Sequence, residues 1–211
     1  MDRLGQLLDA SAPLLRRVDE VLSSAGAPPG HPVWPELRRV RLLPGDAVRA
    51  VAALRPGELA DAAPELRADA LACADVAESL PPPGAWSGDA AGAYDVARRR
   101  AAIHLSGGPD SIDARLAATA DLADALFEWM EQTRGHLAAT LAEALGSGEA
   151  LTLATDGPVD PTACAEVLAA AEIGHWVLRT ISQRYEEVDD LLHGSADLAE
   201  AQSPLPSVRA W

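Results

Sequence analysis

Apolar residues recur every three or four positions through most of this chain, which is the spacing of one face of an α-helix. The most regular run lies between Ser111 and Leu145. Its inward positions follow one another in alternating steps of four and three: Ile112, Leu116, Thr119, Ala123, Leu126, Met130, Thr133, Leu137, Thr140 and Ala144. This alternation predicts a heptad seam on a single helix, about 50 Å long at about 1.5 Å per residue.

The same periodicity predicts helices on both sides of this run. Leu4 to Ser24 is expected to form one broken helix or two short ones, because Pro13 interrupts the pattern. Residues 57–80 and 89–105 each carry a helical stripe. The last helix is predicted to start near Asp160 and to run to about His193, with Gly194 as its C-cap. Its predicted inward positions are Val167, Ala170, Ile173 or Gly174, Val177, Ile181 and Val188. Gly146-Ser147-Gly148 ends the seam helix, and residues 149–158 are predicted to be a loop or a short extended piece.

Breaker residues divide the chain into four expected parts. Residues 1–24 form an N-terminal helical segment, and residues 25–56 combine a Pro- and Gly-rich linker with short helices. Residues 57–193 are expected to form the main helical bundle, and residues 194–211 a disordered C-terminal tail. The predicted fold class is all-α, as an elongated antiparallel helical bundle with a helix-turn-helix hairpin.

Composition supports helices over strands and restricts the partners. The chain is 48% hydrophobic but only 4% aromatic, so its apolar content is mostly Ala, Leu and Val, which suits closely packed helices. The formal net charge is -15, and every basic side chain other than histidine is arginine. This balance argues against nucleic acid as a partner, since phosphate binding requires a basic surface. A basic or neutral protein surface is favoured instead; no role is assigned to the local basic patch Arg38 to Arg41.

The sequence also lacks the signals of membrane insertion. No stretch approaches the ~20 apolar residues that span a bilayer. The first residues, Met1 to Asp9, are interrupted by charge and lack the apolar core of a cleavable signal peptide. Any export is therefore expected to use a route independent of such a signal. Cys73 and Cys164 lie in apolar helical contexts, where buried free thiols are expected, with a disulfide or an oxidation-sensitive site as the alternatives.

No set of residues predicts catalysis, a cofactor or a metal. The five histidines are scattered, and no two are four residues apart. Glu172 and His175 match one Glu-x-x-His motif of carboxylate-bridged di-iron bundles, but such sites need a second copy and two more inward glutamates. A di-metal carboxylate enzyme is therefore a distant alternative. The main expectation is a protein without enzymatic activity, and Glu172 and His175 are expected to be an ordinary pair on a helix surface.

The turn between the two middle helices is the most distinctive stretch of the chain. Pro81-Pro82-Pro83 cannot continue a helix, because proline lacks the backbone N–H and clashes with the preceding turn. Ser87 is predicted to be the N-cap of the next helix, and Gly88 permits a close backbone approach. Trp86 then lies in the turn itself, where it is expected to be a partly buried anchor that plugs the space between the helices.

A second distinctive pair lies near the end of the last helix. Tyr185 and Asp189 are four residues apart and therefore share one helical face. Tyr185 is expected at the edge of the bundle, half covered, with its hydroxyl and the Asp189 carboxylate exposed. The acidic residues around it lie near a helix C-terminus, which prefers cations, and this suggests a surface kept for a basic partner. A frayed acidic helix end is the alternative interpretation.

Together, the Trp86-Ser87-Gly88 turn and the Tyr185-x-x-x-Asp189 pair make the chain resemble the WxG helical-hairpin family of type VII (ESX) secretion substrates. The resemblance covers Leu59 to Leu105 and, less closely, the helices to His193. It implies export of a cytoplasmic protein to the cell surface or medium through a composite signal read by the secretion ATPase. Trp86 and Gly88 would form one half of that signal, and Tyr185 and Asp189 the other.

The chain departs from the small members of this family in two respects. Its tyrosine motif lies two helices beyond the turn, and the chain is about twice their usual length. It therefore looks more like the larger substrates that hold both halves in one fold, with a small WxG-type partner or a second copy as possible additions. The alternative function is a cytoplasmic helical adaptor or assembly module, with the heptad seam as a dimer interface.

Overall fold

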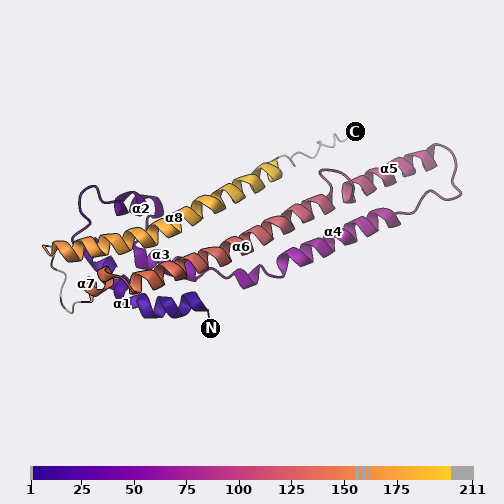
Figure 1. Cartoon of the computed structure of the whole chain (residues 1–211). Helices are drawn as coiled ribbons and strands as arrows, with labels where there is room; N and C mark the ends of the chain where they lie inside the picture. Colours follow the sequence, from indigo (N-terminus) through magenta and orange to yellow (C-terminus); the bar gives the residue numbers. More distant parts are fainter. Residues whose placement is uncertain (1, 155–156, 158–159, 161, 201–211) are drawn as a thin grey trace. The chain divides into compact units, whose positions relative to one another are not determined.

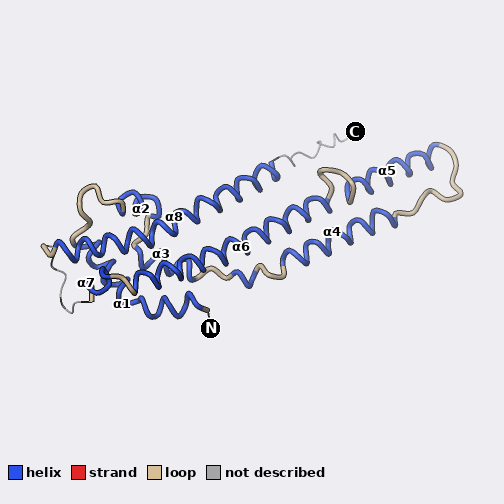
Figure 2. Tube along the Cα trace, in the orientation of Figure 1, coloured by secondary structure: helices blue, strands red, loops and turns tan. Residues whose placement is uncertain are grey.

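The computed structural model describes residues 2–154, 157, 160 and 162–200, with side chains to residue 193. The described residues contain helices, turns and loops and no strand (Figure 2). The predicted all-α class is confirmed. The chain divides into two compact units. Unit 1 comprises residues 1–55 and 128–190, and unit 2 comprises residues 56–127 and 191–211. The range 57–193, expected to form one bundle, is thus shared between the two units.

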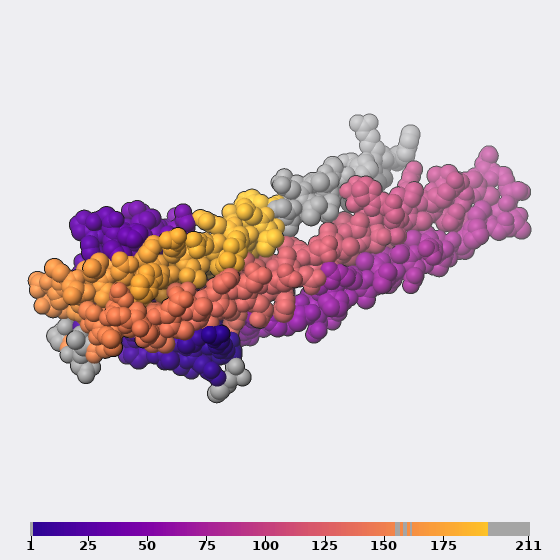
Figure 3. Space-filling model, in the orientation of Figure 1, coloured from indigo at the N-terminus to yellow at the C-terminus, as the bar shows by residue number. Residues whose placement is uncertain are grey.

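Unit 1 combines the N-terminal part of the chain with a second segment, residues 128–190 (Figure 1). Its elements are α1 (Arg3–Ser24), α2 (Val33–Val40), α3 (Pro44–Ala52), the last part of α6 (Ile112–Leu145), α7 (Gly148–Leu153) and most of α8 (Cys164–Glu200). α1 packs against α3 and α7. The unit 1 parts of α6 and α8 lie side by side, as Figure 3 also shows, and the hydroxyls of Thr140 and Thr180 are 3.0 Å apart across them.

Unit 1 contains a continuous core of branched aliphatic side chains. The largest fully buried members are Leu4, Leu15, Val18, Val21, Val33, Val48, Val51, Leu137, Leu141, Ile173, Leu178 and Ile181. They come from α1, α2, α3, α6 and α8, so each of these helices gives one apolar stripe to the same core. The predicted inward positions Ile173, Val177 and Ile181 of the last helix are buried, as the periodicity predicted.

Unit 2 contains η1 (Pro56–Glu58), α4 (Ala62–Ser79), α5 (Asp89–Leu105) and the first part of α6. α4 and α5 pack against each other and run antiparallel (Figure 1). The buried cluster here consists of three alanines, Ala63, Ala120 and Ala123, with Ala62 and Leu66 packed against them. Arg67 of α4 adds ion pairs to Asp121 at 2.8 Å and Asp124 at 2.7 Å on α6. Unit 2 therefore has far less buried aliphatic surface than unit 1.

The N-terminal helix is continuous, so the expected break at Pro13 is wrong. α1 runs from Arg3 to Ser24 with Pro13 inside it. Proline removes the hydrogen bond to the carbonyl four residues earlier, here that of Asp9. Asp9 and Pro13 are both exposed, so solvent can bind the carbonyl that lacks a helical donor. The opposite face of α1, with Leu15 and Val18, packs into the core and keeps the helix in one piece.

Two further expectations about helix ends are also wrong. The predicted loop after residue 148 begins with α7, a short helix whose N-cap Ser147 accepts a hydrogen bond from the N–H of Ala150 at 3.1 Å. Gly194 is not a C-cap, because α8 continues through it to Glu200. Glycine costs a helix only about 1 kcal/mol, and good helix formers follow it in the sequence. Of the predicted tail, residues 201–211 lie outside the described residues.

The predicted seam positions of α6 are buried mainly in the second half of the helix. Ala123, Thr133, Leu137 and Ala144 are buried, whereas Thr119 is exposed. Trp129, which lies one position before the predicted Met130, is buried as well. The seam therefore packs mainly inside unit 1.

Arg134 on α6 joins three parts of unit 1. Its Nη1 donates hydrogen bonds to the carbonyl oxygens of Ala52 at 2.7 Å and Leu54 at 2.9 Å, and a longer one to Val51 at 3.4 Å. Its Nη2 contacts the carboxylate of Asp2. Val51 and Ala52 are the last residues of α3, where helical donors run out, and Leu54 follows just beyond the helix. Arg134 therefore caps α3 from another helix, a contact that no local sequence pattern indicates.

Asp19 of α1 caps the opposite end of α3. Its Oδ1 accepts a hydrogen bond from the N–H of Gly45 at 3.0 Å. Burial raises the pKa of Asp19 above its ordinary value of 3.8, and the Gly45 N–H opposes this rise. The Asp46 carboxylate raises the pKa of Asp19 further, and Arg49 lowers it.

We expect this arrangement to make stability depend on pH. A carboxyl whose pKa is raised in the folded state binds more protons there than in the unfolded chain, so its contribution is fully present below 3.8 and is lost as the pH rises through the folded pKa. Asp19→Asn keeps an oxygen for Gly45 but does not ionise. Urea unfolding at about pH 3 and about pH 7 should show the stability of the variant, relative to the wild type, increasing with pH. For an Asp46→Asn control, the stability relative to the wild type should change less between the two pH values. If the stability of Asp19→Asn relative to the wild type is the same at both pH values, the prediction is wrong.

Within the described residues, no helix is both long enough and apolar enough to cross a membrane. Cys73 is half-buried and Cys164 is exposed, and both are free thiols. The expectation of buried thiols is therefore wrong for Cys164, which begins α8 at a position facing away from the core.

Candidate functional site

The turn between α4 and α5 presents Trp86 to solvent. α4 ends at Ser79 and α5 begins at Asp89, and the Trp86 side chain between them is 64% exposed. The expectation of a partly buried plug is therefore wrong. Ala77 of α4 and Ala91 of α5 are the buried residues next to the turn. Helices that meet through alanine lie close together, which leaves no space between them for an indole ring.

The exposed indole ring contacts the ring of Tyr94, which is itself held by a hydrogen bond. It packs on the ring of Tyr94, with a centroid distance of 5.6 Å and an interplanar angle of 54°. The Tyr94 hydroxyl in turn donates a hydrogen bond to the carbonyl of Pro81 at 2.8 Å. Tyr94 thus connects the first turns of α5 to the proline segment, with Trp86 resting on its ring.

The N-cap of α5 is Gly88, and the prediction of Ser87 is wrong. Gly88 has φ 87° and ψ -170°, a left-handed conformation that side-chain-bearing residues rarely adopt. Its carbonyl accepts the N–H of Gly92 at 3.2 Å, which closes the first helical turn. The glycine of the Trp-x-Gly motif is therefore required by backbone geometry.

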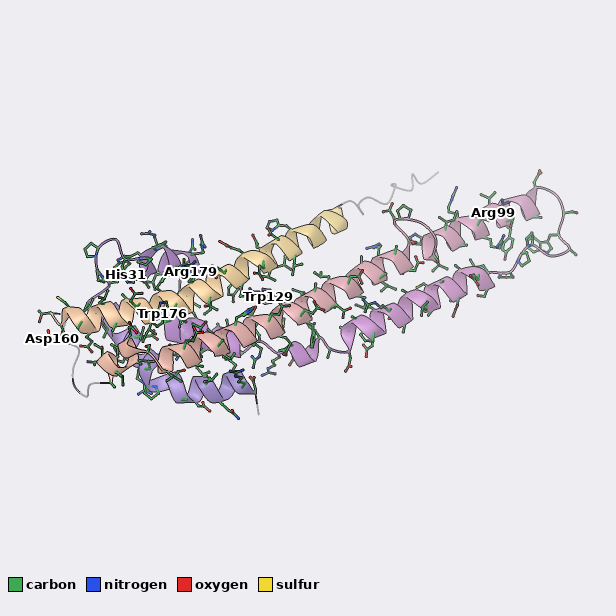
Figure 4. The ribbon with its side chains drawn as sticks, in the orientation of Figure 1. His31, Arg99, Trp129, Asp160, Trp176 and Arg179 are labelled. Atoms are coloured by element: carbon green, nitrogen blue, oxygen red, sulfur yellow. The ribbon has the colours of Figure 1, made fainter. Side chains whose placement is uncertain are left out.

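Tyr185 and Asp189 lie one turn apart on α8. Tyr185 is 45% exposed and Asp189 is exposed, as the sequence predicted. The Tyr185 ring makes an edge-on contact with Trp129, with a centroid distance of 6.0 Å. Figure 4 shows Trp129 between α6 and α8, where its Nε1–H donates to the Arg184 carbonyl at 2.7 Å. Trp129 therefore fixes both the backbone and the ring at this point of α8.

Neighbouring acidic residues on α8 are partly neutralised within the chain. Glu186 forms an ion pair with Arg39 of α2 at 2.7 Å, and Glu187 forms one with Arg184 at 2.7 Å. Arg39 belongs to the basic patch for which the sequence suggested no role, and it now joins α2 to α8. The acidic helix end is thus less available to a basic partner than its composition suggested.

The two predicted motifs lie in different units. Trp86 and Gly88 belong to unit 2, and Tyr185 and Asp189 belong to unit 1. Each motif has an exposed aromatic ring that contacts a second aromatic ring.

The Glu172–His175 motif contributes to a histidine pair in unit 1. His31 packs edge-on against His175, with a centroid distance of 6.4 Å, and its Nε2 lies 3.4 Å from a Glu172 carboxylate oxygen. His31 Nδ1 accepts the N–H of Val33 at 3.2 Å, at the start of α2. A neutral histidine that accepts at Nδ1 carries its proton on Nε2, which then lacks the lone pair a metal needs. No group of three or more metal-binding side chains occurs in the described part of the chain.

Sequence reasoning missed Tyr94 and Trp129, the two aromatic supports. Tyr94 lies within the predicted helix 89–105, but nothing in the spacing indicates its contact with Trp86. Trp129 lies one residue before the predicted seam position Met130. A tryptophan next to a heptad position is a signal of burial that could have identified it. No family model matches the chain, and no curated protein or solved structure was found to be similar to it.

Because Trp86 is exposed, we expect Trp86→Ala to have little effect on stability. Surface substitutions usually change the free energy of unfolding by less than about 0.5 kcal/mol, and here only the contact with Tyr94 is lost. Trp129→Ala is the contrasting variant, because a buried aromatic truncated to alanine costs about 3–5 kcal/mol. Thermal unfolding followed by circular dichroism compares the two. Equal losses of stability in both variants would contradict the exposed placement of Trp86.

Proposed function

We propose that this protein is a non-enzymatic substrate of, or a protein associated with, a type VII (ESX) secretion system. The observation that carries the proposal is the exposed Trp86 side chain, fixed by Tyr94 in a turn that requires Gly88. A large aromatic residue that contributes little to packing is costly to expose, and exposed aromatic residues are enriched where proteins recognise one another. This placement suits a recognition element better than a structural one.

The second half of the proposed signal is Tyr185 with Asp189. Their side chains are exposed on one face of α8, and Trp129 limits the freedom of the tyrosine ring. A preorganised ring loses less conformational entropy on binding, which favours recognition by the secretion ATPase. A small WxG-type helical protein is a further proposed partner.

The alternative of a cytoplasmic adaptor that dimerises through the heptad seam has less support. The seam residues Thr133, Leu137 and Ala144 of α6 are buried within a single chain. They are therefore already occupied by contacts in unit 1.

Secretion of variants tests the proposal. The chain is expressed in a host with an active type VII system and in the same host without the secretion ATPase. We expect the wild type in the culture filtrate of the first host only. Tyr185→Ala combined with Asp189→Ala should abolish export, because the proposed recognition face loses both of its groups. Trp86→Ala should do the same through the other half of the signal.

The controls separate recognition from folding. Leu192→Ala removes another exposed side chain of α8 and should leave export unchanged. Circular dichroism should show wild-type helicity and melting temperature for the Trp86 variant, and a change of less than about 1 kcal/mol for the α8 double variant. Normal export of both motif variants, or export without the ATPase, would refute the proposed function.

A further inference from the structure

Helix α5 has two faces of different character. One face packs against α4 and includes the buried Ala91 and the half-buried Tyr94 and Arg98. On the opposite face, Val96 is 54% exposed and Ile103 is 62% exposed. These two residues are seven positions apart, so they lie two turns along one stripe of the helix. A β-branched apolar residue recurring on the solvent side is unusual for a helix whose buried residue on the packing face is an alanine.

Two arginines lie between the apolar residues of this stripe. Arg99 and Arg100 line, with Val96 and Ile103, a shallow groove of ≈ 360 Å³ along α5. Arg99 projects from α5 (Figure 4) and contacts Asp95, which also pairs with Arg98 at 2.9 Å. The described structure shows no carboxylate within ion-pairing distance of Arg100. The groove is therefore apolar at its ends and basic at its centre, on a chain whose net charge is -15.

From this pattern we infer that the exposed face of α5 is a docking site for an acidic amphipathic helix of a partner protein. Apolar side chains spaced seven residues apart on the partner would contact Val96 and Ile103. Glu or Asp side chains between them would pair with Arg99 and Arg100. The spacing i, i+3, i+4, i+7 of the four groove residues is the spacing with which one helix packs along another.

Charge selects this occupant over two others. A second copy would bring an identical α5 face, and its arginines would oppose those of the first. An anionic membrane surface would attract the groove, but it is broad and would also face the rest of the chain, which carries -15 as a whole. An acidic helix contacts only the small area around the groove, so it gains the attraction there and meets less repulsion from the rest of the chain. This inference does not depend on the proposed export role.

Binding of two matched peptides to the full chain tests the inference. The acidic peptide is a helix of about six turns with leucines at heptad spacing and glutamates beside them, and the control peptide has lysine in place of every glutamate. Fluorescence anisotropy should show saturable binding of the acidic peptide. Val96→Glu with Ile103→Glu should weaken it at least about tenfold, and Arg100→Glu by a similar factor that shrinks in high salt. Leu71→Glu is the matched control, because Leu71 on α4 is 69% exposed and lies outside the groove.

The other outcomes would overturn the inference. These are equal binding of the lysine peptide, equal weakening by Leu71→Glu, and no saturable binding of the acidic peptide. Self-association that Val96→Glu abolishes would identify a second copy as the occupant. Retention of the chain on phosphatidylglycerol vesicles, lost in Arg100→Glu, would identify a membrane surface. All substituted positions are exposed, so circular dichroism should show that each variant keeps the wild-type helicity.

Discussion

Leu137→Asp is expected to unfold unit 1. Leu137 of α6 is fully buried in the aliphatic core. The substitution removes that packing and places a carboxylate where no partner can reach it, so it should cost more than about 4 kcal/mol. This is a large share of the 5–15 kcal/mol that typically separates the folded and unfolded states, hence the expected loss of the fold. Urea unfolding followed by circular dichroism measures the change.

Leu126→Asp is the matched control on the same helix. Leu126 is only half-buried and lies in the unit 2 part of α6. The aspartate can reach solvent there, so the loss of stability should be clearly smaller. The sequence pattern gave the two positions equal weight, and the structure separates them. An obligate dimer in sedimentation, converted to folded monomers by Leu137→Asp, would contradict the intrachain core.

Arg134→Ala should also destabilise unit 1 strongly. The substitution leaves the carbonyls of Ala52 and Leu54 without their side-chain donor. It also removes the guanidinium contact with Asp2. Hydrogen bonds to charged groups contribute about 1.5–3 kcal/mol each, and their effects here overlap, so the expected loss is about 3 kcal/mol. Thermal and urea unfolding of the variant give the value.

Asp2→Asn separates the two roles of Arg134. It weakens the exposed ion pair and keeps every bond to the α3 carbonyls. Exposed ion pairs contribute about 0–1 kcal/mol, so this variant should unfold close to the wild type. If Asp2→Asn costs as much as Arg134→Ala, then the ion pair matters and the capping of α3 does not.

Helix positions could be predicted from the sequence because apolar spacing records which face is buried. The spacing predicted the long helix through Leu137 and the core positions Ile173 and Ile181. It misjudged Pro13 and Gly194, since each was interpreted by its local preference alone. Tertiary packing of α1 outweighs one missing hydrogen bond at Pro13, and a single glycine is too weak to end α8.

The residues of the candidate site could be predicted from the sequence, but their burial and contacts could be predicted only in part. The Trp-x-Gly turn and the exposure of Tyr185 follow from local patterns. Burial of Trp86 was predicted wrongly, because ring size suggests packing but cannot show that alanines bring α4 and α5 together. The supports Trp129 and Arg39 act across helices far apart in the sequence, and a single sequence does not reveal such contacts.

The alanine-built contacts of unit 2 have a consequence for the dynamics of the chain. Three buried alanines and the ion pairs of Arg67 hold α4 and the first part of α6, whereas a full aliphatic core holds the last part of α6. Opening of a segment costs free energy in proportion to the apolar surface it exposes. The α4–α5 hairpin should therefore open and close many times for each unfolding of the whole protein. The backbone amides of the single continuous helix α6 should then exchange their hydrogens with solvent at two very different rates. The change from fast to slow exchange should lie near residue 127.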